Sequence, residues 1–263
     1  MRTRRSTLGL ALACGCLIAG CDEPGDSLLY VFSTHHATPE DGVFPDRGGE
    51  DMPRVFENDL GWTVTLLESY VTINSLTVIA CDGTQYPLEM FWGPCPEDMR
   101  EQDLDILTVA GRKMPEGYYC QLVVGYGPYT IPELEPDDQD TRHETPTNTE
   151  IDGSTVYLSG GANRGVEGEE PVEFELTNGR SLTVELDLSS LGGPGSPLHI
   201  SADEEFPVEL TVSKTYDRYF DGIDFATYDP DDLEDELDNV LRDSTRVQEG
   251  PIVKMFDPDD DDG

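Results

Sequence analysis

Basic residues are scarce in this chain. Its 263 residues include 16 lysines and arginines against 55 aspartates and glutamates, which gives a formal net charge of −39 at pH 7. Only Lys113, Lys214 and Lys254 are lysines. Because proteins bind DNA and RNA mainly through basic contacts to phosphate, this shortage excludes nucleic acid as a partner. Such an acidic excess favours solubility or adaptation to a salty habitat, and less often the capture of cations.

Signatures of common enzymes are also missing. The sequence contains no Gly-x-Ser-x-Gly nucleophile turn, no His-Glu-x-x-His zinc helix and no glycine-rich phosphate or dinucleotide loop. A catalytic triad needs a histidine that is oriented by a carboxylate and reaches a nucleophile. The sequence alone locates no such arrangement among its 4 histidines and 55 acidic residues. We therefore expect a protein that is not an enzyme.

The longest apolar run is too short to cross a bilayer. It covers residues 8–18 and follows Arg2, Arg4 and Arg5, an arrangement typical of a secretion signal. Residues 18–21 read Ile-Ala-Gly-Cys and resemble a bacterial lipobox, in which the cysteine receives lipid after cleavage. The sequence thus predicts a signal peptide over residues 1–20 and lipidation of Cys21, with an ordinary cleavage region as the alternative. The Arg4-Arg5 pair also suggests twin-arginine export.

Lipidation of Cys21 predicts a location in the cell envelope, on the periplasmic face or the outer surface. Each acyl CH₂ group buried in lipid contributes about 0.8 kcal/mol, so several chains on one cysteine hold a protein stably at a membrane. Residues 21–27 are expected to form a short lipidated tether. Removal of residues 1–20 takes away three arginines and no acid, leaving 13 basic and 55 acidic residues, a formal charge of −42 (13 minus 55).

Glycine and proline punctuate the rest of the chain. The 26 glycines and 19 prolines separate short segments rich in β-branched residues, a pattern typical of an all-β protein. Over residues 182–188 apolar and polar residues alternate, as in a half-buried strand. We expect a two-sheet antiparallel β-sandwich over residues 28–228. The predicted strands cover residues 28–32, 62–68, 70–81, 105–110, 117–125, 154–159, 172–177, 181–188 and 208–213.

Two dipeptides between apolar runs predict tight hairpins. They are Asp82-Gly83 and Asn178-Gly179, both preferred sequences for two-residue turns. In contrast, residues 132–150 contain prolines and few apolar residues, which predicts a long loop.

Residues 229–263 form an acidic C-terminal segment. Within it, apolar residues recur at helical spacing over residues 233–241, which predicts one short helix. The sequence Asp-Pro-Asp-Asp occurs twice, but without the glycine and terminal glutamate of a helix-loop-helix calcium site. We expect a solvated tail, with loose calcium binding through acidic loops as the alternative.

Three cysteines remain after the N-terminal ones are assigned to the signal and the lipid. Cys81, Cys95 and Cys120 allow one disulfide and one spare thiol in an oxidising compartment. We favour a Cys95–Cys120 bridge, which closes about 25 residues and contributes about 3 kcal/mol in the chain-entropy treatment. Cys81 is the alternative partner, because it ends a predicted strand beside the same loop. The spare thiol is expected to be a small buried hydrophobe.

Three histidines are candidate metal ligands. His35 and His36 follow the first predicted strand, so we expect them at a sheet edge, where an imidazole can bind copper or zinc. His143 lies in the long loop beside Glu144 and could come over the same end of the sandwich. We therefore predict His35, His36 and His143 as copper ligands. The alternative is that these histidines are exposed and bind nothing.

The order of strand and turn residues over positions 28–191 resembles the MbnP-like family, the periplasmic partner proteins of methanobactin operons. The resemblance is carried by residues 70–73, 76–79, 82–83, 87–88, 92, 105–107, 114–119 and 182–189. It implies an all-β envelope protein that binds copper through histidines. In some members it also implies an oxidised tryptophan, here Trp92, matured by a di-haem partner enzyme. The chain departs from the family pattern near residues 127–129, where it lacks the family's histidine.

Two functions from different classes are therefore expected. The first is an envelope-anchored lipoprotein that binds copper through neutral histidines, with a di-haem enzyme as partner. The second is a non-catalytic surface β-sandwich that binds a protein or carbohydrate partner, or calcium through its acidic loops. The sequence predicts no oligomeric state for either.

Overall fold

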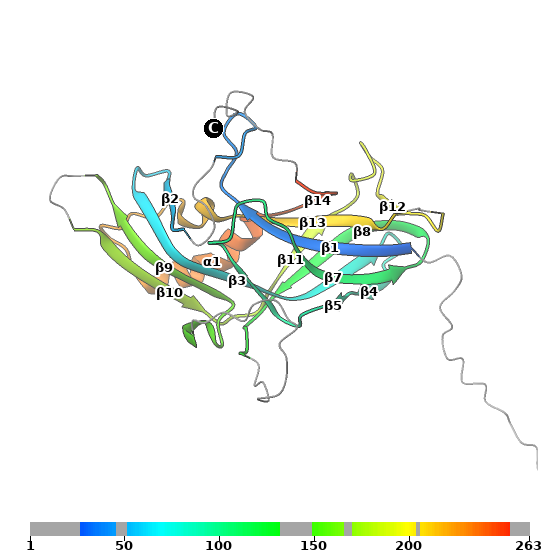
Figure 1. The fold of residues 1–263 in the computed structure, drawn as a ribbon, viewed down its shortest axis with the longest axis horizontal. Coiled ribbons are helices and arrows are strands. Elements are labelled where there is room, and N and C mark those ends of the chain that lie inside the picture. Colours follow the sequence, from blue (N-terminus) through cyan, green and yellow to red (C-terminus); the bar gives the residue numbers. More distant parts are fainter. Residues whose placement is uncertain (1–26, 46–51, 132–148, 166–169, 204–205, 253–263) are drawn as a thin grey trace, which may run out of the picture.

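The structure is a computed structural model that describes residues 27–45, 52–131, 149–165, 170–203 and 206–252. The predicted all-β class and the two-sheet sandwich are confirmed: two largely antiparallel sheets face one another and a single described α-helix accompanies them (Figure 1). The predicted signal peptide, Cys21 and His143 lie outside the described residues. No helix in the described part of the chain is long and apolar enough to span a membrane.

The smaller sheet has five strands in the order β14-β13-β1-β7-β5. Its central strand β1 is parallel to β13 and antiparallel to β7. The first and last thirds of the chain therefore meet in one sheet, because β13 belongs to the C-terminal part. The strands are β1 (Ser27–His36), β5 (Glu89–Met90), β7 (Leu107–Met114), β13 (Val208–Thr215) and β14 (Thr245–Glu249).

The larger sheet has nine strands arranged around β3, an 18-residue strand that covers both segments predicted at 62–68 and 70–81. Its main path is β10-β9-β3-β8-β11, with β2, β4 and β6 also paired to β3 and β12 paired to β8. The strands are β2 (Arg54–Glu57), β3 (Thr63–Ala80), β4 (Gln85–Pro87), β6 (Cys95–Asp98), β8 (Gly117–Tyr126), β9 (Val156–Asn163), β10 (Val172–Asn178), β11 (Leu182–Asp187) and β12 (Leu198–Ile200).

Strands β9 and β8 follow one another along the same side of β3. The N–H of Thr72 donates to the carbonyl of Thr155, just before β9, and the carbonyl of Thr72 accepts from Gly127, just after β8. Because the N–H and C=O of one strand residue point to the same side, both neighbours lie on that side. The sheet thus has two halves, β9 with β10 and β8 with β11.

This arrangement decides the two hairpin predictions. The turn at Asp82-Gly83 is confirmed, since β3 and β4 pair antiparallel across it and Gly83 has a φ of 91°. The hairpin at Asn178-Gly179 is wrong: β10 pairs with β9 and β11 pairs with β8. The chain instead steps from one half of the sheet to the other at this point, so the two strands never become neighbours.

The predicted C-terminal helix is confirmed as α1 (Pro230–Ser244). Leu237 and Leu241 are each 1% exposed and join the core between the sheets. The chain then forms β14 against β13, so the expectation of a solvated tail is wrong for residues 245–249. Two short 3-10 helices, η1 (Thr149–Ile151) and η2 (Tyr216–Phe220), complete the described elements.

Candidate functional site

The sequence predicted that His35 and His36 lie at a sheet edge, and this prediction is wrong. Strand β1 continues to His36 and is the middle strand of the smaller sheet. His35 is 2% exposed and His36 is 7% exposed. The polar residues after Phe32 are part of the strand because their side chains find buried polar partners.

His35 belongs to a buried ionic cluster with Ser33, Glu97 and Lys214. Register pairs His35 with Lys214 across the parallel strands β1 and β13, so both side chains leave the smaller sheet on the same face. The carboxylate of Glu97, on β6 of the larger sheet, contacts both side chains. Nδ1 of His35 lies 2.9 Å from Oε1, and Nζ of Lys214 lies 2.6 Å from Oε2. Ser33 donates to the same Oε2 atom and accepts from Lys214 at 2.6 Å.

The charges in this cluster compensate one another. Burial by itself raises the pKa of Glu97, but Lys214 and His35 outweigh that effect and bring its pKa down to about 2. Glu97 is therefore a carboxylate that ties the two sheets together. A buried ion pair of this kind requires both partners, since either charge left alone is costly.

A second group of charged residues lies on the other side of the His35 ring. Nε2 of His35 is 3.0 Å from the carbonyl of Glu101 and 3.9 Å from Oδ1 of Asp103. Asp103 also accepts from Tyr216 at 2.8 Å and pairs with Nε of Arg54 at 3.3 Å. Burial raises the pKa of Asp103, against the effects of His35, Tyr216 and Arg54.

These contacts leave His35 poorly suited to bind a metal. Both of its ring nitrogens face oxygen atoms, Oε1 of Glu97 and the carbonyl of Glu101. A metal ligand must present a nitrogen lone pair, so copper could bind only if one of these contacts opened.

His36 retains one such nitrogen. Its Nδ1 donates to the carbonyl of Ala37 at 2.8 Å, which leaves the lone pair on Nε2. Its ring meets the edge of Phe44, with the centroids 4.8 Å apart. Burial lowers the pKa of His36, which favours the neutral form that metals require. Among the residues that the structure describes, no group of three histidine, cysteine, aspartate or glutamate side chains is placed to hold a metal ion.

The disulfide joins Cys81 to Cys120, and the favoured Cys95–Cys120 pairing is wrong. The Cα atoms of the bridge are 4.9 Å apart. The β3–β8 register accounts for this pairing, since Ala80 lies opposite Tyr119 and brings the adjacent cysteines together. Cys95 faces the core at 2% exposure, and burial together with nearby Glu97 raises the pKa of its thiol to about 12. The expected spare, buried thiol is therefore Cys95.

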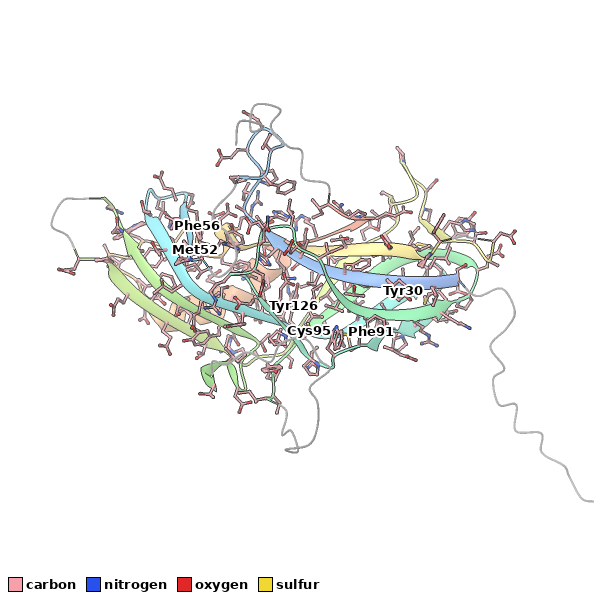
Figure 2. All side chains as sticks on the ribbon, in the orientation of Figure 1. Tyr30, Met52, Phe56, Phe91, Cys95 and Tyr126 are labelled. Carbon is pink, nitrogen blue, oxygen red and sulfur yellow. A yellow bond between two sulfur atoms is a disulfide. The ribbon has the colours of Figure 1, made fainter. Side chains whose placement is uncertain are left out.

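An open aromatic surface lies on the smaller sheet, away from the core. Tyr30 of β1 is the register partner of Gly111 on β7, and Phe91 follows β5 beside it. The two rings are 6.1 Å apart between centroids, and both lie close to Gly111. Figure 2 marks Tyr30 and Phe91. A side chain at this glycine would place its Cβ 2.7 Å from Tyr30 and 2.8 Å from Phe91. We call Tyr30, Phe91 and Gly111 the aromatic platform.

The aromatic platform lies in a hollow of about 600 Å³. The hollow is lined by an acidic residue, Glu89, and a basic residue, Lys113. The side chain of Phe91 is 44% exposed. Nearby Arg112 donates to the carbonyl of Pro87 at 2.8 Å and lies over the ring of Tyr86. The hollow thus combines apolar ring faces with hydrogen-bonding groups.

The sequence analysis did not single out this platform. Its members come from β1, β5 and β7, and only pairing in the sheet brings them together. Two local signals were available: a glycine inside a strand, which often marks a close approach, and the adjacent basic residues Arg112 and Lys113 in an acidic chain.

The protein is thus a two-sheet β-sandwich with a buried ionic cluster between the sheets and the aromatic platform on the outer face of the smaller sheet. No protein-family model matches the chain, and no curated protein does. A search of solved structures finds MbnP from Methylosinus trichosporium, with 11% sequence identity and a TM-score of 0.35. The match covers 73% of this chain and 78% of that one. The resemblance to that protein is a distant structural one.

Proposed function

We propose that the chain is an exported, lipid-anchored and non-catalytic β-sandwich that binds a carbohydrate on the aromatic platform. One observation carries this proposal: Tyr30 and Phe91 meet beside Gly111 in an open hollow that also contains Glu89 and Lys113. Of the two functions expected from the sequence, this geometry favours the surface binding module.

The chemistry of the hollow suits a sugar ring. Aromatic rings offer apolar faces to the C–H groups of a sugar, and the absence of a side chain at Gly111 allows both rings to approach the sheet. A carboxylate and an ammonium at the rim can accept from and donate to sugar hydroxyls. The hollow of about 600 Å³ also lies within the usual size range of small-ligand sites, roughly 300–1,000 Å³.

Binding to a panel of soluble oligosaccharides, measured by calorimetry, tests the proposal. Phe91→Ala should weaken binding by about tenfold or more, because a half-exposed anchor ring is lost while the core is untouched. Tyr118→Ala is the matched control: this tyrosine is 57% exposed, lies on the larger sheet and stacks on His199. Absence of binding to every sugar, or equal losses in the two variants, would contradict the proposal.

An envelope location is supported by the Cys81–Cys120 disulfide, because such bonds persist in oxidising compartments. The lipid on Cys21 is tested separately by labelling cells with a fatty-acid analogue. The label should appear on the native chain and disappear in Cys21→Ser. Mass spectrometry that finds an intact leader on the protein from its native envelope would overturn this part of the proposal.

Copper binding is the second candidate function. The observation in its favour is that the Nε2 lone pair of His36 is left available, on a ring whose lowered pKa keeps it neutral. His143 would have to supply a further ligand. A di-haem enzyme remains the proposed partner for this function alone.

A further inference from the structure

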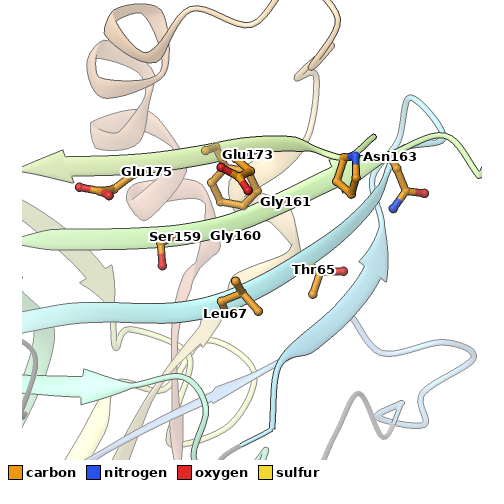
Figure 3. Close-up of a pocket in the computed structure, with 10 residues that line it drawn as sticks. Thr65, Leu67, Ser159, Gly160, Gly161, Asn163, Glu173 and Glu175 are labelled. Atoms are coloured by element: carbon orange, nitrogen blue, oxygen red, sulfur yellow. The ribbon is translucent and has the colours of Figure 1, made fainter. Parts of the chain in front are cut away.

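A groove of about 610 Å³ runs over the larger sheet, on strands β3, β9 and β10 (Figure 3). Its middle row is Ser159, Gly161 and Asn163 on β9, which are partly exposed while their neighbours Gly160 and Ala162 are buried. Alternate residues of a strand point to opposite faces, so this row lies on the face away from the core. The aromatic platform lies on the other sheet and shares none of these residues.

The groove is hollow because its middle strand carries small side chains between larger ones. Thr65 and Leu67 of β3 form one wall, and Glu173 and Glu175 of β10 form the other. Leu67 lies at a bulge between Leu66 and Glu68 and is 50% exposed. In register, Glu173 lies beside Gly161.

The two glycines of β9 have different reasons to be glycine. A Cβ at Gly160 would lie 2.1 Å from the carbonyl oxygen of Thr65 and 2.8 Å from Phe174, so the packing of the sheet requires glycine there. A Cβ at Gly161 would meet only ordinary contacts, 3.5 Å from Pro171 and 3.7 Å from the carbonyl oxygen of Val172. Packing therefore does not explain Gly161, whose missing side chain keeps the groove open.

We propose that this acidic groove binds an extended segment of a protein partner that carries lysine or arginine at alternate positions. Glu173 and Glu175 are two residues apart on one strand and on one face, which separates them by about 6.8 Å. An extended peptide presents every second side chain at the same spacing, so two basic residues can face the two carboxylates. The apolar stems of those side chains can lie over Gly161 and against Leu67.

Charge alone does not distinguish this groove, because an acidic chain attracts any basic peptide. A matched pair of carboxylates occurs on β11, where Glu185 and Asp187 have the same spacing and are also exposed. Their register partners on β8 are Val123 and Gln121, whose side chains occupy the positions where β9 has Gly161 and Ser159. The β11 pair therefore offers the charge without the hollow.

The probe is a labelled, end-blocked peptide with lysines at alternate positions, and its binding to the chain is followed by fluorescence anisotropy. The double variant Glu173→Gln with Glu175→Gln should weaken binding by about fivefold or more, since two ion pairs are lost. The double variant Glu185→Gln with Asp187→Asn changes the net charge equally and should weaken binding by less than about twofold. Equal losses in the two double variants would overturn the proposal.

Gly161→Val separates shape from charge. Valine suits a strand and has room for its Cβ here, so the variant should fold while its side chain fills the groove. Peptide binding should fall by about fivefold or more although no charge has changed. Unchanged affinity in a folded Gly161→Val variant would overturn the proposal, as would equal affinity for a peptide with the same lysines placed side by side.

Discussion

Lys214 and Glu97 join the two sheets of the sandwich. Nζ of Lys214, on β13 of the smaller sheet, lies 2.6 Å from Oε2 of Glu97, on β6 of the larger sheet. The side chains are 0% and 6% exposed, so water screens this pair very little. His35 supports the carboxylate from its other oxygen atom. The resulting contact fixes how the sheets face one another at this point.

Removal of one partner should be strongly destabilising. In Lys214→Met the carboxylate of Glu97 stays buried without its ammonium, which should lower the free energy of unfolding by about 3–5 kcal/mol. Urea unfolding followed by circular dichroism measures this loss. The control is Arg164→Gln, which removes an exposed ion pair to Asp224 and a contact with the ring of Trp62, and should lose about 1 kcal/mol. Similar losses in both variants would contradict the role assigned to the buried pair.

Acid should weaken the fold through Glu97. The folded pKa of about 2 lies below the ordinary value of 4.5, so the carboxylate stabilises the protein above pH 4.5. That contribution, on the order of 3 kcal/mol, is lost as pH falls from 4.5 to about 2. Urea unfolding at several pH values in this range should show the decline in the native chain. A Glu97→Gln variant should show a shallower decline, and identical slopes would contradict the assignment.

The sequence predicted the fold class better than the ends of its strands. Segments with alternating apolar and polar residues, and segments rich in β-branched residues, predicted the sandwich correctly, because a period-two pattern indicates a strand with one buried face. The end of β1 was missed because Ser33 and His35 read as loop residues when their partners are unknown. Lys214, which accounts for their burial, is 181 residues away from Ser33 along the chain.

The candidate site was harder to predict for the same reason. Tyr30, Phe91 and Gly111 have no common motif, and only the pairing of three strands brings them together. The disulfide likewise follows from the register of β3 with β8, which no count of cysteines supplies. The Asn178-Gly179 turn was a sound local signal, but β10 and β11 pair with different neighbours, β9 and β8, which follow one another along the same side of β3.

The revised cysteine assignment predicts a distinct thiol behaviour. In a chain without residues 1–21, Cys95 should be the only free thiol, and it should react slowly in the folded protein because it is buried and has a pKa of about 12. Titration with a thiol reagent should detect one thiol after unfolding and almost none before. Cys95→Ala should abolish this signal, whereas rapid reaction of the native protein would contradict the prediction.

Loss of the Cys81–Cys120 bridge should lower stability even though Cys81 is exposed. The bridge links residues 39 positions apart. Closing a loop of this length contributes about 4 kcal/mol in the chain-entropy treatment. Urea unfolding of Cys81→Ser with Cys120→Ser, compared with Cys95→Ala, measures the loss. A mass increase of two hydrogens on reduction of the native chain, absent in the double variant, verifies the bridge independently.

Copper binding should depend on His36, the candidate ligand, and not on the exposed His199. His36→Ala removes the available Nε2 lone pair, so the copper content of protein purified from its native envelope should fall to background. His143→Ala tests another of the three predicted ligands in the same way. His199→Ala is the control, because that ring stacks on Tyr118 on another part of the surface and should leave the copper content unchanged. Elemental analysis supplies the measurement, and copper that persists in the His36→Ala variant would exclude this ligand.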